Sequence, residues 1–199
     1  MNCSDNLSTA TADAASLIAC IEREFAGTQR AETSLRQFLL TDKYGMSEDI
    51  SEREWVASGK DRVDSIWQEI PDAEIEECEG LLAHMEAEEF LYYLPAYMRY
   101  AVAYQHRTSW ETDVLGMTVH ALSPFERNRD LRAHAIAKYA VFNAAQRHAV
   151  VLFLTFVAQV DESLSGQYAL DALANYWQAD TARLARQHCH RLHSPHEKF

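Results

Sequence analysis

The sequence predicts an all-α fold, a single irregular multi-helix bundle packed around a central apolar helix at about residues 144–160. Apolar residues recur at helical spacing along most of the chain, and no alternating apolar and polar run is flanked by hairpin turns. Only six glycines and four prolines occur among 199 residues, which is too few for a turn-rich β fold. We expect one helical domain over residues 1–187 and a flexible, polar, His-rich tail over residues 188–199.

The first third of the chain contains segments with helical periodicity. Residues 11–26 place an apolar stripe opposite charged side chains and stop at Gly27. Residues 35–40 have apolar side chains at spacings of three and four, which favours a helix over a strand. Residues 47–60 are rich in charge, and they fit either an exposed helix or an ordered loop pinned by Trp55.

Proline residues set two boundaries in the middle of the chain. Residues 61–70 predict a short packed helix that ends against Pro71. Residues 86–107 predict a longer helical segment that contains Pro95. Because proline lacks an amide hydrogen and clashes with the preceding turn, at a cost of about 3 kcal/mol, we expect a helix boundary or a sharp kink at Leu94–Pro95.

The most apolar segment follows a helix-start signal. Asn143 and Gln146 have the spacing of a capping box, in which each side chain hydrogen-bonds the backbone amide of the other residue. Residues 149–158 are hydrophobic almost all round, which is typical of a helix buried in a core. This segment belongs to the helix at about 144–160 that we expect the others to surround. A last helix is expected to begin near Ser165.

The chain has the features of a soluble cytoplasmic protein that does not enter a membrane. Its first residues carry no basic and apolar signal sequence. The apolar run at 149–158 is shorter than the roughly 20 residues that span a bilayer. The four cysteines are far apart, and no pair has the spacing of a structural zinc site or a redox CxxC motif, so reduced thiols are expected.

The net charge of −12 is concentrated in one part of the chain, residues 48–89, which we call the acidic segment. It contains fifteen Asp and Glu residues but three Lys and Arg residues. The glutamates that dominate it are Glu74, Glu76, Glu77, Glu79, Glu86, Glu88 and Glu89. The charge fits a solvated face, or a surface that attracts a basic protein and repels nucleic acid.

Sequence motifs for catalysis are missing, which favours a non-enzymatic role. No nucleophile elbow, Walker-type phosphate loop or Gly-rich dinucleotide fingerprint occurs. Tyr92, Tyr93 and Tyr97 would be able to line a pocket at the expected helix break, where Glu89 would supply a carboxylate. Packing of the same aromatic rings in the core is the other interpretation.

The tail contains the residues best suited to bind a metal. His188, Cys189 and His190 offer imidazole and thiolate ligands for zinc, copper or nickel. Their spacing matches no standard zinc motif, and no residues that would orient them are evident. We therefore expect no cofactor, and these three residues stand as the candidate metal ligands.

Several short stretches of the chain, taken in order, form a recognisable sequence pattern. They are Ile21-Glu-Arg-Glu-Phe25-Ala-Gly27, Trp67-Gln-Glu-Ile70-Pro71, Tyr93-Leu-Pro-Ala96, Phe142-Asn-Ala-Ala-Gln146 with Val151-Leu-Phe-Leu154, and Ala172-Leu-Ala-Asn-Tyr-Trp177. Together they resemble a bacterial family of small helical proteins catalogued as domain of unknown function 6714. The Tyr-Leu-Pro-Ala block is the most specific part, and the resemblance covers about residues 15–180. It implies no activity, cofactor or catalytic residue that transfers to this chain.

Three functions are compatible with these features. The leading hypothesis is a non-enzymatic interaction protein that docks a basic protein through residues 48–89, as an antitoxin or immunity protein does. One alternative is a small-molecule or metal-dependent enzyme with a pocket at Leu94–Pro95. The other alternative is a structural subunit that forms homo-oligomers through an exposed apolar helix face.

Overall fold

The computed structural model describes residues 3–45, 50–60, 62–124 and 127–178. Within these ranges every regular element is a helix, so the predicted all-α bundle is confirmed. The elements are α1 (Cys3–Glu24), α2 (Leu35–Tyr44), α3 (Glu52–Ser58), η1 (Trp67–Glu69), α4 (Asp72–Glu77), η2 (Leu81–His84), α5 (Ala87–Ala103), α6 (Val114–Ala121), α7 (Arg129–Tyr139), α8 (Ala144–Val160), α9 (Leu164–Ala172) and η3 (Leu173–Trp177). Elements η1 and η2 are 3₁₀-helices, and η3 is a π-helical turn.

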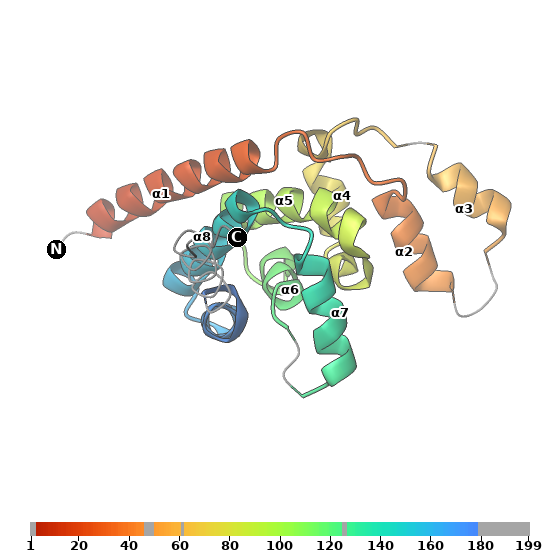
Figure 1. Ribbon diagram of the computed structural model, residues 1–199. Coiled ribbons are helices and arrows are strands. Elements are labelled where there is room, and N and C mark those ends of the chain that lie inside the picture. The colour runs from red at the N-terminus through yellow and green to blue at the C-terminus, as the bar shows by residue number, and fades with distance from the viewer. Residues whose placement is uncertain (1–2, 46–49, 61, 125–126, 179–199) are drawn as a thin grey trace, which may run out of the picture.

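Helix α5 forms the centre of one half of the core. It packs against α1, α4, α6, α7, η1 and η2, and eleven of its seventeen residues are buried. The predicted central helix, α8, packs chiefly against α1, α9 and η3. Because α1 lies along both α5 and α8, it joins the two halves of the core (Figure 1).

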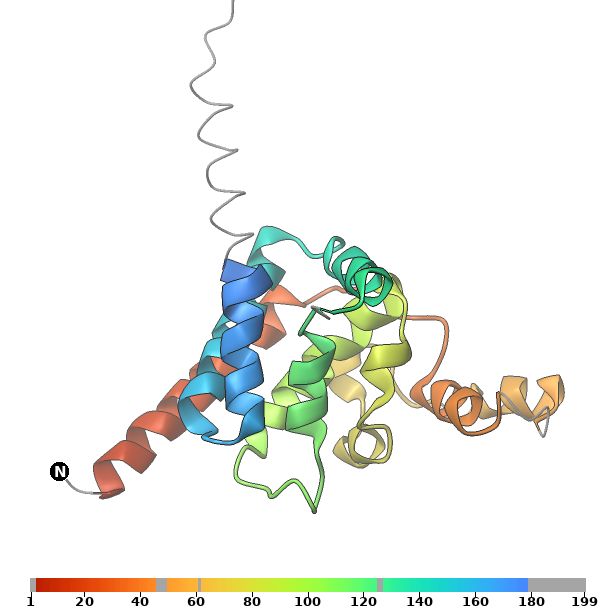
Figure 2. The ribbon, with the colours of Figure 1, turned by 90° about the horizontal axis from the view of Figure 1, so that it is seen from below.

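Helices α2 and α3 extend from one side of this core, opposite the end from which the first turns of α1 extend (Figures 1 and 2). Helix α3 has no buried residue. The indole of Trp55 donates a hydrogen bond to the hydroxyl of Thr41 at 3.0 Å, which ties α3 to α2. The expected exposed helix pinned by Trp55 is therefore present.

Helix α5 runs without interruption through Pro95, so the predicted helix boundary at Leu94–Pro95 is wrong. Proline removes one backbone hydrogen bond from a helix interior, at a cost of about 3 kcal/mol. Leu94, Ala96 and Tyr97 are fully buried around it. A break at this position would expose these apolar groups to water, so packing on all sides outweighs the cost of the proline.

Residues 62–66 are not helical, so the predicted packed helix over 61–70 is reduced to the single turn of η1. Val63 and Ile66, which would share the apolar face of such a helix, are 66% and 48% exposed. The side chain that faces inward is Asp64, which is 5% exposed. It is accompanied into the interior by Arg62 as its counter-ion. The backbone path here is therefore set by a buried ion pair, which the spacing of apolar residues in the sequence does not reveal.

Helix α8 begins where the capping box predicts. The side chains of Asn143 and Gln146 each accept a hydrogen bond from the backbone amide of the other residue. Leu152 and Val160 of α8 remain 37% exposed. Among the described residues, no single helix is long and apolar enough to span a membrane. Helices α7 and α8 together have the required length and hydropathy, but they are bent by 120° relative to each other.

Candidate functional site

Four tyrosines of α5, together with Tyr104 directly after it, form a row of hydrogen-bond donors, which we call the tyrosine row. Each hydroxyl donates to a different residue of the region before α5. The acceptors are Asp64 Oδ2 for Tyr92 (2.5 Å), Thr33 O for Tyr93 (2.8 Å), Cys78 O for Tyr97 (2.7 Å), Glu76 Oε1 for Tyr100 (2.6 Å) and Asp72 Oδ2 for Tyr104 (2.8 Å). Most of the row lies on one stripe of α5, since helical residues three and four apart are neighbours. The row therefore attaches the acidic segment to the core.

Tyr92, Tyr93 and Tyr97 do not line a pocket at Pro95. The three residues are at most 1% exposed, and none of them lines the four best-defined hollows of the described chain. Burial raises the pKa of all three phenols above the ordinary value, and for Tyr92 the bond to Asp64 raises it further. These tyrosines are structural donors, as the core-packing interpretation expects.

Arg62 and Asp64 form a buried ion pair beneath the tyrosine row. The guanidinium donates from Nε to Asp64 Oδ1 at 2.8 Å and from Nη2 to Oδ2 at 2.7 Å. A third donor, Nη1, reaches the carbonyl oxygen of Ala31, and the guanidinium lies 5.4 and 5.8 Å from the ring centres of Tyr92 and Tyr93. Each charged side chain is 5% exposed.

The pKa of Asp64 is lowered from its ordinary value. Burial alone would raise it, but the hydrogen bonds from Arg62 and Tyr92 and the attraction of the Arg62 charge outweigh that effect. Asp64 is therefore an ionised structural acceptor at neutral pH. The pair explains why a charged segment is able to follow a buried path, because each partner satisfies the other.

Three of the seven predicted glutamates, Glu76, Glu77 and Glu79, bind other parts of the chain. The partners are Arg107 for Glu76 at 2.7 Å, Arg36 for Glu77 at 2.7 Å, and the Thr112 hydroxyl and Asp113 amide for Glu79 at 3.1 and 2.8 Å. These bonds attach α4 and the residues after it to α2 and to the loop between α5 and α6. Part of the acidic charge thus has a structural role.

The carboxylates of Glu74, Glu86, Glu88 and Glu89 form no hydrogen bond or ion pair with the part of the chain that the structure describes. Glu88 and Glu89 lie in the first turn of α5, where the helix dipole favours a carboxylate. Tyr100, which holds Glu76, lies eleven residues further along α5, a distance of about 16 Å at 1.5 Å per residue. Glu76 and the glutamates of the first turn of α5 therefore lie at different positions along this helix.

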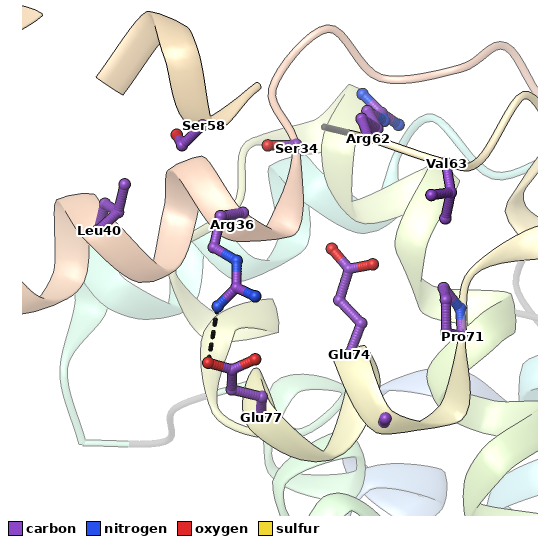
Figure 3. A pocket seen from close by; sticks show the side chains of 10 residues that line it. Ser34, Arg36, Leu40, Ser58, Arg62, Val63, Pro71, Glu74 and Glu77 are labelled. Carbon is purple, nitrogen blue, oxygen red and sulfur yellow. Dashed lines mark hydrogen bonds and ion pairs between the residues drawn. The ribbon is translucent and has the colours of Figure 1, made fainter. Parts of the chain in front are cut away.

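Glu74 points into a hollow of this region, which we call the α2–α4 groove (Figure 3). The groove lies between α2, the end of α3, residues 62–71 and α4, and its cavity volume is about 520 Å³. Its polar lining residues are Ser34, Arg36, Ser58, Arg62, Glu74 and Glu77. Burial, and then the charge of Asp64, raises the pKa of the Glu74 carboxyl.

A second hollow of about 370 Å³ lies beside the start of α5, where Glu32, Glu88 and Glu89 share the lining with Leu91 and Val141. Within the described ranges no three His, Cys, Asp or Glu side chains are grouped so that they would hold a metal ion. The predicted tail ligands His188, Cys189 and His190 lie outside the described residues.

We predict that Tyr92→Phe lowers the free energy of unfolding by about 1.5–3 kcal/mol, because the lost hydroxyl leaves a buried carboxylate with one donor fewer. Tyr93→Phe is the matched control. It removes the same hydroxyl from an equally buried ring, but the acceptor that loses its donor is the neutral carbonyl of Thr33. The expected loss of unfolding free energy is therefore about 0.5–1.5 kcal/mol. Urea denaturation at pH 7 measures both values, and a loss for Tyr92→Phe no larger than the control would contradict the role of Asp64.

A second prediction concerns pH. Because the folded-state pKa of Asp64 lies below its unfolded value of about 3.9, ionised Asp64 stabilises the fold above about pH 4, and this contribution is lost as the pH falls through the folded-state pKa. The difference in unfolding free energy between the wild type and Asp64→Asn should be constant above about pH 5 and shrink below about pH 4. Asp13→Asn, at an exposed position, is the control. A difference in unfolding free energy between the wild type and Asp64→Asn that does not change with pH would refute the lowered pKa of Asp64.

The comparisons with known proteins identify a family for this chain. No curated protein and no solved structure matches the chain. Residues 13–181 match the family described as "Family of unknown function (DUF6714)". This range agrees with the resemblance expected from the sequence over residues 15–180. The chain belongs to this family.

Proposed function

We propose that this chain is a non-enzymatic interaction protein whose acidic segment binds a basic protein partner, in the manner of an antitoxin or immunity protein. The observation that carries the proposal is a set of four glutamates whose carboxylates form no hydrogen bond or ion pair with the described residues: Glu74, Glu86, Glu88 and Glu89. The tyrosine row fixes the backbone that bears most of this segment. Groups held in place before binding lose less conformational entropy when a partner arrives.

The charge distribution supports the same proposal. A net charge of −12 with its excess in one segment attracts basic proteins over long distances and speeds their encounter. The same charge repels the phosphates of nucleic acid, so no nucleic-acid partner is proposed. A bacterial cytoplasm is part of the proposal, and the unpaired thiols of Cys20 and Cys78 support a reducing compartment.

The test begins with affinity capture from the cells that encode the protein, followed by identification of the retained protein and measurement with the purified pair. We expect a basic partner whose association rate falls steeply with ionic strength. The triple variant Glu86→Gln, Glu88→Gln, Glu89→Gln should slow association about tenfold at low salt.

The control for this experiment removes the same charge elsewhere, in Asp13→Asn, Glu22→Gln, Glu162→Gln, at three exposed positions. It should slow association less than the first triple variant does, because charges outside the contact surface contribute only the weaker, longer-range part of the attraction. Equal effects of the two triple variants, or a captured partner without excess basic charge, would count against the proposal.

A homo-oligomer subunit is a second candidate, and the outer face of α9 favours it. Leu164 is 71% exposed and Tyr168, four residues later on the same face, is 48% exposed. Apolar side chains gathered on one face often mark a contact between proteins. Light scattering should show a dimer or larger species that Leu164→Glu with Tyr168→Glu dissociates. A monomer at high concentration would exclude this candidate.

A further inference from the structure

We propose that the α2–α4 groove receives one lysine or arginine side chain of the basic partner, with Glu74 as its counter-ion. This inference rests on the proposed function and specifies where the partner's principal cation binds. Three features support it: the aliphatic wall of the groove, the bonds that its other polar groups already form, and the one carboxylate left without an ion pair.

The groove offers an aliphatic wall beside one carboxylate. Leu40, Val63, Pro71 and Ala73 line it together with Glu74. Val63 is 66% exposed in the chain alone, so it has apolar surface that a ligand would cover. Lysine and arginine carry three or four methylene groups below a charged head, and such stems pack along apolar surface while the head reaches a polar partner.

The other polar side chains of the groove are already committed. The Ser34 hydroxyl accepts from the amide of Gln37, and the Ser58 hydroxyl donates to the carbonyl of Trp55. Arg62 is held by Asp64, as described above. Figure 3 shows Arg36 bonded to Glu77 while Glu74 points into the open part of the groove. Among the described lining residues, Glu74 alone lacks a hydrogen-bond or ion-pair partner.

The ion pairs around the groove leave one lining carboxylate for a monovalent cation. Glu77 is paired with Arg36 and Arg62 with Asp64. Asp64 also lies 3.8 Å from Arg30, so the charges balance overall and Glu74 is the lining carboxylate without an ion pair. An anion would compete with Glu77 and Asp64 for arginines that are already bound. Calcium and magnesium ions take six or more oxygen ligands, and one unpartnered carboxylate supplies at most two.

The size of the groove fits a side chain with its adjoining backbone. Its volume of about 520 Å³ falls within the range of about 300–1,000 Å³ that is usual for ligand pockets. A cation paired with the half-buried Glu74 carboxylate would replace the interactions with water that burial has removed. The groove is therefore a receptor for one cationic anchor, and Glu86, Glu88 and Glu89 are left to contact the rest of a basic surface.

The test uses the full chain, methyl NMR spectra and a capped pentapeptide, acetyl-Ala-Ala-Arg-Ala-Ala-amide, with Lys, Gln and Glu versions at the central position. We expect the Arg and Lys peptides to shift the methyl signals of Val63 and Leu40 saturably, and the Gln and Glu peptides to leave them in place. Glu74→Gln should weaken binding about tenfold, equivalent to about 1.4 kcal/mol. Glu88→Gln is the matched control and should bind like the wild type.

Two results would overturn the assignment: no saturable shift at Val63 and Leu40, or equal binding by wild type and Glu74→Gln. Measuring Glu74→Gln against the purified partner separates this inference from the proposed function. If partner binding is unchanged by Glu74→Gln but lost in the variant of Glu86, Glu88 and Glu89, the groove assignment fails while the proposed function stands. If Glu74→Gln weakens both peptide and partner binding, both are supported.

Discussion

The attachment of the acidic segment to α5 by phenol hydroxyls is the constraint on which the remaining arrangement depends. The five hydroxyls of the tyrosine row reach five acceptors between Thr33 and Cys78. A hydrogen bond to a neutral group contributes about 0.5–1.5 kcal/mol, and one to a charged group about 1.5–3 kcal/mol. Three of the acceptors are carboxylates, so the row fixes both the backbone and the charges of the segment. α5 in turn remains helical through Pro95 because its aromatic and apolar side chains are buried on all sides.

This attachment divides the acidic residues into two groups with different roles. Asp64, Asp72 and Glu76 accept hydrogen bonds from the tyrosine row, and Glu77 and Glu79 bind α2 and the loop before α6. The second group has no such bonds within the described chain and comprises Glu74, Glu86, Glu88 and Glu89. Internal bonding keeps the first group in place, and this rigidity holds Glu74 at the edge of the α2–α4 groove. The proposed function uses the second group, because only carboxylates without internal partners are available to another protein.

Local features of the fold could be predicted from the sequence, and features set by distant residues could not. The capping box of Asn143 and Gln146 lies within four residues, so its signal is complete in the sequence. The helix boundary predicted at Pro95 is absent because the packing that keeps α5 helical comes from other helices. Residues 129–139 carry no clear apolar stripe, since Leu131 is 46% exposed while Lys138 is buried, and α7 was not anticipated. The roles of Glu76 and Glu77 depend on Arg107 and Arg36, which are 31 and 41 residues away.

The central claim is that the tyrosine row holds the acidic segment on the core, and native-state hydrogen exchange tests it most directly. The amides of Ile75 and Cys78 in and after α4 are hydrogen-bonded to the backbone, so their exchange reports local opening of the segment. In Tyr97→Phe with Tyr100→Phe, these amides should exchange at least about tenfold faster than in the wild type, with the middle of α5 changed much less. Equal acceleration of both regions, or no acceleration near α4, would contradict the claim.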